Sequence, residues 1–182
     1  MYILGDIGNT ETKIWLVSKK NKIIKKINFT SKEITNNKLS KIFNKNNFKF
    51  KYIEKILFCS VVPQTFILIK KFLSKKTNIK CHEVKNLNLK SLIKVKVDYK
   101  QVGSDRITNA ISLMNEKNNY IILDFGTATT FDVLIKKTYH GGIIAPGVQL
   151  SLNSLSDRAT LIPKINLKKI AKVIGNNTIS AV

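Results

Sequence analysis

Two stretches of this chain carry the same pattern of residues, and that pattern is suited to holding phosphate. In the first stretch an apolar run ends at Asp6, and a glycine, an asparagine and a threonine follow at residues 8–10. In the second, an apolar run ends at Asp124, and a glycine and a threonine follow at residues 126–127. Glycine lets a ligand approach bare backbone and can adopt positive φ, while short hydroxyl and amide side chains supply hydrogen bonds beside it. The chemistry predicted for both stretches is binding of a polyphosphate.

Each stretch is predicted to be the turn of a β-hairpin. Apolar residues resume at 14–17 after the first turn and at 131–135 after the second, so each pattern indicates strand, turn and strand. The tyrosine, aspartate, glycine and last threonine of the first stretch all recur in the second at the same distance along the chain. At this distance Phe131 of the second stretch corresponds to Lys13 of the first. A single Asp-x-Gly turn is common in hairpins without function, but an internal duplication indicates two halves built on one unit. Two such hairpins facing each other would clamp a nucleotide, and a purely structural repeat is the alternative.

Asp105 lies between the two stretches, in the first turn of a predicted helix. Gly103 can turn the chain, and apolar residues recur at helical spacing over 107–114. Arg106 follows with a planar fork that suits a carboxylate. It is one of only two arginines among 32 basic residues, which indicates that this position needs the geometry of arginine. Helix capping with a surface ion pair is the simpler alternative.

Two further segments with glycine precede predicted helices. Residues 140–147 hold three glycines and a proline, which implies a fixed backbone shape. We expect a loop here that either lines the nucleotide pocket or makes a tight turn between domains. Residues 175–178 end at Thr178, which resembles a helix-start residue. Its hydroxyl could contact a ligand or simply cap the helix.

The remaining pattern alternates strands and helices, which is typical of an α/β protein. We expect a strand over 22–29, a helix capped by Ser31 or Thr35, a buried strand over 53–62, an amphipathic helix over 66–73 and a short strand over 80–84. The predicted domains are residues 1–106 and residues 107–182, the second beginning with the helix that leads into the second hairpin.

Composition limits the classes of partner. The net charge of +21 invites a nucleic-acid role, but 30 of the 32 basic residues are lysines spread along the chain, whereas base reading favours arginine. We interpret the charge as a compositional bias and do not expect a nucleic-acid partner. No apolar run is long enough to span a bilayer and the N-terminus lacks signal-peptide features, so a cytoplasmic protein without membrane contact is expected. Cys59 and Cys81 have no metal or redox spacing, and Cys59 is expected to be buried.

Taken in order, six segments resemble the motifs of the type III pantothenate kinases. They extend over nearly the whole chain: residues 6–10 with Lys13, 60–63, 103–106, 124–129, 141–147 and 175–178. One motif alone is weak, but six in sequence form a specific signature. The resemblance implies the acetate and sugar kinase, Hsc70 and actin superfamily. The fold class it implies is α/β, with duplicated ribonuclease-H-like domains, mixed sheets and ATP in the cleft between them.

The resemblance also implies a reaction and a role for each motif. The reaction is ATP-dependent phosphorylation of pantothenate to 4'-phosphopantothenate, the first step of coenzyme A biosynthesis. Asp105 would be the general base, Asp6 would hold magnesium, and Asp124 would hold a monovalent cation, K⁺ or NH₄⁺. ATP would be bound by residues of both hairpins, namely Asp6, Ile7, Gly8, Asn9, Thr10, Glu11, Thr12, Lys13 and Thr127. Pantothenate would be bound by Gly103, Ser104, Asp105, Arg106 and Thr178.

Further expectations follow from the same resemblance. Family members are homodimers, so a homodimer is expected here. The chain stops at Val182, inside the helix that follows Thr178, so the second domain is expected to be incomplete at its C-terminus and the activity of this chain is left open. The segment between Tyr99 and Gly103 is shorter than usual and lacks an Asn-Pro pair. Some family members have been described as transcriptional activators, so a non-catalytic regulator on the same fold is the alternative function.

Overall fold

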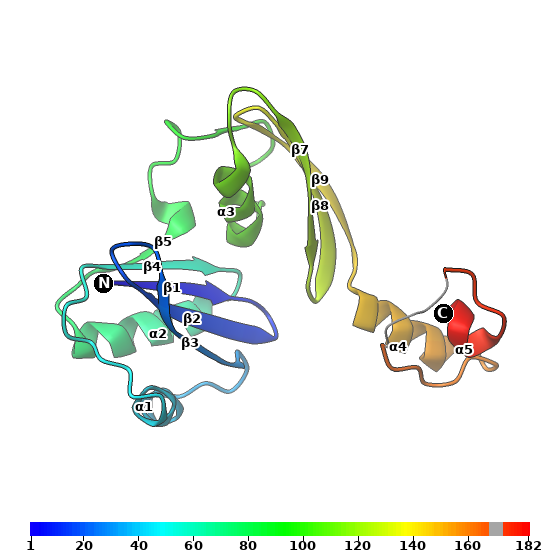
Figure 1. Cartoon of the computed structure of the whole chain (residues 1–182), viewed down its shortest axis with the longest axis horizontal. Helices are drawn as coiled ribbons and strands as arrows, with labels where there is room; N and C mark the ends of the chain where they lie inside the picture. Colours follow the sequence, from blue (N-terminus) through cyan, green and yellow to red (C-terminus); the bar gives the residue numbers. More distant parts are fainter. Residues whose placement is uncertain (168–172) are drawn as a thin grey trace.

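The computed structural model describes residues 1–167 and 173–182. Its first half contains β1 (Tyr2–Ile7), β2 (Glu11–Val17), β3 (Ile23–Thr30), α1 (Asn36–Lys45), β4 (Lys55–Ser60), α2 (Pro63–Lys76), β5 (Cys81–Glu83) and the short 3-10 helix η1 (Val84–Asn86). Its second half contains β6 (Lys94–Val95), α3 (Ser104–Leu113), β7 (Asn119–Phe125), β8 (Ala128–Ile135), β9 (Thr138–Pro146), α4 (Val148–Arg158) and α5 (Thr178–Ala181). The C-terminal helix α5 lies at the far end of the molecule from the first sheet (Figure 1).

The first sheet has the strand order β3-β2-β1-β4-β5. Strands β3, β2 and β1 pair antiparallel, while β4 and β5 continue the sheet in parallel with β1. This mixed order is the ribonuclease-H-like arrangement that the family resemblance implies. Alternate residues of β1, such as Ile3 and Ile7, are fully buried against Phe58 and the helices, because successive side chains of a strand point to opposite faces. The strand therefore presents Asp6 on the face opposite to the first core.

The second sheet repeats the antiparallel part of the first. Its order is β6-β9-β8-β7, so β7, β8 and β9 correspond to β1, β2 and β3, and β6 adds a short parallel edge. Ile122, Leu134 and Tyr139 of this sheet pack against Ile107 and Ala110 of α3 to form the second core. The α/β class, the mixed sheets and the duplication are confirmed.

The two hairpins differ at their turns. The first turn comprises residues 8–10 and pairs Asp6 with Lys13, whereas the second comprises only residues 126–127 and pairs Asp124 with Thr130. The constant spacing in the sequence suggested Phe131 as the counterpart of Lys13, and this is wrong. Because the second turn is one residue shorter, Thr130 occupies the position across from the aspartate.

Most predicted elements appear where the sequence places them, with two differences. Residues 140–147 do not form a loop, because all but Gly147 belong to the long strand β9, which leads directly into α4. Strand β6 pairs with β9 and so belongs to the second sheet, although it precedes residue 106. The domain boundary between residues 106 and 107 falls inside helix α3 and stays a prediction.

Helix starts follow local signals. Thr35 caps α1, since its hydroxyl accepts a hydrogen bond from the Lys38 amide over 3.2 Å. The other candidate cap, Ser31, is buried instead and its hydroxyl lies 2.8 Å from that of Thr12. Pro63 begins α2, where its missing amide proton costs nothing.

The face of the second sheet opposite α3 carries exposed apolar side chains. Ile121, Leu123 and Phe125 alternate with inward-facing residues of β7, and Ile143 of β9 lies on the same face two strands away.

None of the helices within residues 1–167 and 173–182 has the length and apolar character needed to cross a membrane.

Candidate functional site

A cleft of about 660 Å³ lies where the tips of the two hairpins approach each other. Its lining comes from both halves of the chain: Asp6, Gly8, Asn9, Thr10, Glu11, Lys13, Val61, Asp105, Asp124, Phe125, Gly126, Thr127, Ala128, Thr130, Gln149, Leu150 and Asn153. The side-chain hydroxyls of Thr10 and Thr127 are 2.9 Å apart and connect the two turns directly. The two predicted phosphate-binding turns are therefore brought to one place.

The first hairpin turn is closed by its own backbone. The Gly8 amide donates to the Glu11 carbonyl over 3.0 Å, and the side chains of Asn9 and Thr10 at the tip are exposed. Neither Gly8 nor Gly126 has a positive φ, so the flexibility of glycine is not used for left-handed backbone in these turns. A side chain at Gly8 would come within 3.2 Å of the Glu11 carbonyl oxygen. The missing side chain therefore lets the backbone at Gly8 and at Glu11 approach closely.

Charges gather around the start of this hairpin. Burial raises the pKa of Asp6, the nearby Lys13 ammonium lowers it, and the carboxylates of Asp105 and Asp124 raise it again. Lys13 Nζ lies 3.6 Å from Glu11 Oε2, and Glu11 Oε1 also accepts a hydrogen bond from Asn28 Nδ2 over 2.9 Å. Lys13 is therefore placed to balance negative charge that enters the cleft beside Asp6.

Two residues of the predicted nucleotide-binding stretch do not reach the cleft. Ile7 and Thr12 are fully buried, and they pair with each other across β1 and β2. Ile7 belongs to the first core, and the Thr12 hydroxyl contacts Ser31. The alternation of strand side chains separates these two from their neighbours Asp6 and Lys13, which line the cleft.

Hydrogen bonds connect the second hairpin to α3 and to the start of α4. The Gly126 amide donates to the Ala128 carbonyl over 3.0 Å, and the Gly147 amide donates to the Thr127 carbonyl over 3.1 Å. Asp124 is exposed at the end of β7, where one carboxylate oxygen accepts from the Asn109 side chain over 2.9 Å. Its other carboxylate oxygen has no hydrogen-bond partner among the described residues, so it is available to a ligand in the cleft.

Asp105 enters the cleft from the first turn of α3. Its Oδ1 accepts a hydrogen bond from the Arg106 amide over 2.8 Å. Burial raises the pKa of the Asp105 carboxyl, the Arg106 amide opposes that rise, and the negative charge of Asp124 adds to it. A side chain at Gly103 would come within 2.3 Å of Asp105 Oδ1, so the missing side chain leaves room for this carboxylate.

Arg106 does not point into the cleft. Its guanidinium binds Asp132 of β8, with Nε donating to Oδ1 over 2.8 Å and Nη2 lying 2.6 Å from the same oxygen. Asp132 is fully buried and also accepts from the hydroxyl of Tyr139 on β9, over 2.5 Å. The sequence showed the need for an arginine but not its partner. The available signal was an acidic residue inside the apolar run of residues 131–135.

The other residues predicted to bind the second substrate lie outside the cleft lining. The Ser104 hydroxyl donates to Glu83. Thr178 is exposed in the first turn of α5, whose N-cap is Asn177. Their roles toward a substrate stay predictions.

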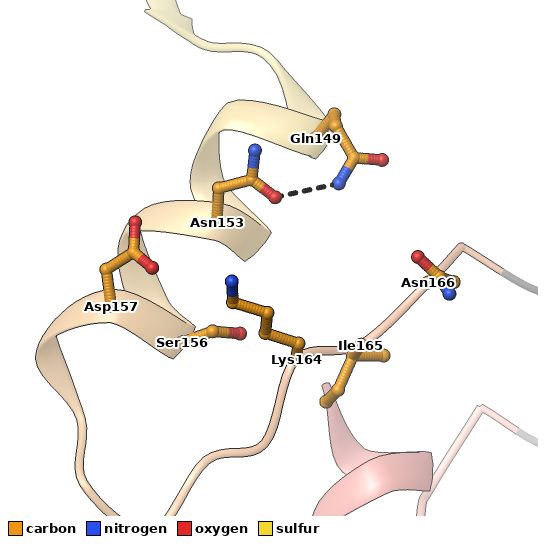
Figure 2. A pocket seen from close by; sticks show the side chains of 7 residues that line it. All are labelled: Gln149, Asn153, Ser156, Asp157, Lys164, Ile165 and Asn166. Atoms are coloured by element: carbon orange, nitrogen blue, oxygen red, sulfur yellow. Dashed lines mark hydrogen bonds between the residues drawn. The ribbon is translucent and has the colours of Figure 1, made fainter.

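Helix α4 contributes cleft residues that lie outside the sequence motifs. Gln149 and Asn153 line the main cleft and are joined by a hydrogen bond of 2.9 Å from Gln149 Nε2 to Asn153 Oδ1. Figure 2 shows both side chains on α4 beside a smaller hollow of about 220 Å³, into which Lys164 extends from the following segment. Their spacing of one helical turn was the only signal in the sequence.

The cleft residues suit a hard cation in company with phosphate. Within the described part of the chain, no group of three or more His, Cys, Asp or Glu side chains could hold a metal ion alone. Mg²⁺ commonly binds through one or two carboxylates together with substrate phosphates and water, and does not need a cage of protein ligands. Asp6 supplies such a carboxylate at the end of the first hairpin, and the Asp124 carboxylate lines the same cleft from the second.

The family model and the curated relatives indicate one family. Residues 2–182 match the family model described as type III pantothenate kinase. A type III pantothenate kinase of Pelagibacter ubique is 64% identical over 182 residues, covering 100% of this chain and 73% of that protein. One from a Sulfurihydrogenibium species is 37% identical, covering 100% of this chain and 75% of that protein. A Campylobacter jejuni structure described as a Baf family transcriptional activator superposes with a TM-score of 0.59 at 18% identity, over 98% of this chain and 70% of that one.

Proposed function

The chain belongs to the type III pantothenate kinase family, and on that premise we propose that it transfers a phosphoryl group from ATP to the primary hydroxyl of pantothenate. The product would be 4'-phosphopantothenate, in the first step of coenzyme A biosynthesis. One observation carries the proposal: Asp105 shares a single cleft with both phosphate-type hairpin turns. A general base and a polyphosphate site are the two parts that this reaction requires.

ATP phosphates would lie between the two turns. Asn9, Thr10 and Thr127 present exposed side-chain donors there, and Lys13 supplies a positive charge. A Mg²⁺ ion held by Asp6 would neutralise charge on the phosphates. Ile7 and Thr12 would support the turn from within the core and would not contact the nucleotide.

Asp105 would orient the pantothenate hydroxyl and accept its proton. Phosphoryl transfer has a loose transition state, so alignment and charge neutralisation contribute most and the proton leaves late. The raised pKa of Asp105 suits this role, because a base is most effective when its pKa approaches the working pH. The carboxylate also has one oxygen fixed by the Arg106 amide, which limits the directions from which it can accept a proton.

The monovalent cation, K⁺ or NH₄⁺, would bind at Asp124. That carboxylate is exposed to the cleft and keeps one oxygen free of protein hydrogen bonds within the described residues. Gly103, Ser104 and Thr178 would contribute to pantothenate binding as the family resemblance implies. For Arg106, its contact with Asp132 favours a supporting role over direct contact with the substrate.

A homodimer in the cytoplasm is part of the same proposal. The exposed apolar side chains of Ile121, Leu123 and Ile143 on the second sheet support self-association, since such patches often mark interfaces. A non-catalytic regulator is not favoured. The description as a transcriptional activator belongs to a structure that is 18% identical and shares the fold alone.

Turnover by the wild-type chain tests the proposed function. The protein is incubated with ATP, Mg²⁺ and K⁺, and ADP release is measured with and without pantothenate, while mass spectrometry follows the product. We expect ADP release that depends on pantothenate and a product heavier than pantothenate by one phosphoryl group. ATP binding without pantothenate-dependent ADP release would instead support the regulator.

A further inference from the structure

We infer that Asp132 and Tyr139 are positioning residues that fix Arg106 and, through its backbone amide, the carboxylate of Asp105. The inference rests on the proposed function, because it takes Asp105 as the base. Neither residue touches the cleft, so neither is a catalytic residue. Their main route to the reaction would be the first turn of α3, while the Thr130 hydroxyl, which lines the cleft and lies 3.4 Å from Asp132 Oδ2, is a second contact.

The contacts form a continuous chain from the second core to the cleft. The Tyr139 hydroxyl donates to Asp132 Oδ1 over 2.5 Å, and Arg106 Nε donates to the same oxygen over 2.8 Å. The next residue along α3 is Asp105, whose Oδ1 accepts from the Arg106 amide over 2.8 Å. Fixing the Arg106 side chain therefore fixes the rotation of the helical turn that aims Asp105.

Burial makes this arrangement specific. Asp132 and Tyr139 are fully buried, and only 12% of the Arg106 side chain is exposed. Arg106 Nη2 is buried without an aligned hydrogen-bond acceptor among the described residues, so the guanidinium depends on the one carboxylate of Asp132. A buried charge with a single partner has few alternative positions, because any movement away from that partner would leave the charge uncompensated.

The backbone around the pair is shaped to fit the guanidinium. A side chain at Gly142 would come within 2.9 Å of Arg106 Nη2 and within 1.9 Å of the Phe131 carbonyl oxygen. Strand β9 therefore carries no side chain where the arginine passes. Three elements, α3, β8 and β9, converge on the same ion pair.

Tyr139→Phe is the main test, because it removes one hydroxyl and keeps the volume of the core. Tyr120→Phe is the matched control: Tyr120 lies in the same sheet, and its hydroxyl accepts from Asn115 over 2.6 Å, away from the cleft. For Tyr139→Phe we expect a fall in kcat of roughly ten-fold with little change in the KM for ATP, as a displaced catalytic group would give. The control should keep the wild-type kcat.

A second measurement does not depend on turnover. Hydrogen exchange by NMR follows the Arg106 amide, which is predicted to exchange faster in Tyr139→Phe, while the Met114 amide at the other end of α3 keeps its wild-type rate. Asp132→Asn should have the larger effect on the same amide. Equal acceleration along all of α3, or wild-type exchange at Arg106, would overturn the inference and indicate a purely structural ion pair. A wild-type chain without turnover would refute the proposed function and leave this readout intact.

Discussion

The hydroxyl oxygens of Thr10 and Thr127 lie 2.9 Å apart and join the tips of the two hairpins. The two residues belong to the duplicated halves of the chain, each in the turn after its aspartate. A hydroxyl can turn its proton toward either a neighbour or a phosphate oxygen. Two hydroxyls that meet across an otherwise open cleft therefore mark the point where a polyphosphate would be held from both sides.

Thr127→Val is predicted to weaken ATP binding, because the valine keeps the shape of threonine and loses its hydrogen bond. A hydrogen bond to a charged group contributes about 1.5–3 kcal/mol, so the KM for ATP should rise by roughly ten-fold or more. The KM for pantothenate should change little. Steady-state kinetics measures both constants, with Thr160→Val as the control, since Thr160 is exposed and outside the cleft. An unchanged KM for ATP in Thr127→Val would refute the role of this hydroxyl.

Gly147 is predicted to tolerate substitution less than Gly126, although Gly126 is the glycine of the repeated motif. An added side chain at Gly147 would come within 2.3 Å of the Gly126 carbonyl and 2.4 Å of the Thr127 carbonyl, whereas one at Gly126 would meet nothing closer than 3.6 Å. Gly147→Ala should destabilise the protein by about 1–3 kcal/mol, and Gly126→Ala by less than about 0.5 kcal/mol. Urea unfolding of both variants measures the difference. Equal stabilities would mean that α4 does not pack against the turn as described.

Cys59 and Cys81 are predicted to be unreactive in the folded protein. Both thiols are buried, and burial raises the pKa of each to about 12, so the reactive thiolate is scarce at pH 8. A chromogenic disulfide reagent at pH 8 should label neither thiol in buffer and both in denaturant. Fast labelling of one thiol in buffer would show that its surroundings open readily.

Asp105→Asn is predicted to stabilise the folded chain at neutral pH. Burial raises the pKa of the Asp105 carboxyl above its value in the unfolded chain, so the ionised form opposes folding at a pH above both values. This cost disappears as the pH falls below the unfolded value of about 3.9, because the carboxyl is then protonated in both states. Thermal unfolding should therefore show a higher Tm for Asp105→Asn at pH 7 and a smaller difference from wild type near pH 4. A lower Tm for the variant at pH 7 would contradict this sign.

Local signals in the sequence predicted the hairpins and the helix that carries Asp105. Apolar runs ending at Asp6 and Asp124 predicted the strand ends to within one residue, and Gly103 marked the start of α3. Those features depend on a few neighbouring residues, so composition and spacing reveal them. The meeting of the two turns at one cleft was predicted from the duplication.

Other contacts between side chains of distant segments could not be predicted. The pairing of Arg106 with Asp132 depends on how α3 packs against β8, and the role of Gln149 depends on where α4 leaves the sheet. The segment 140–147 looked like a loop because glycine and proline disfavour strands, yet pairing with β8 overrides that preference. A constant spacing in the sequence also does not reveal a one-residue difference in turn length, such as the one that places Thr130 opposite Asp124.

Pantothenate-dependent ADP release by Asp105→Asn tests whether Asp105 is the general base. Asp157→Asn is the matched control, since Asp157 is exposed on α4 and does not line the main cleft. With Asp105 as the base, the Asn variant should lose at least about a hundred-fold in kcat, the usual contribution of general-base catalysis, while binding ATP as wild type does. The Asp157→Asn control should turn over normally. Wild-type turnover by Asp105→Asn would contradict the account.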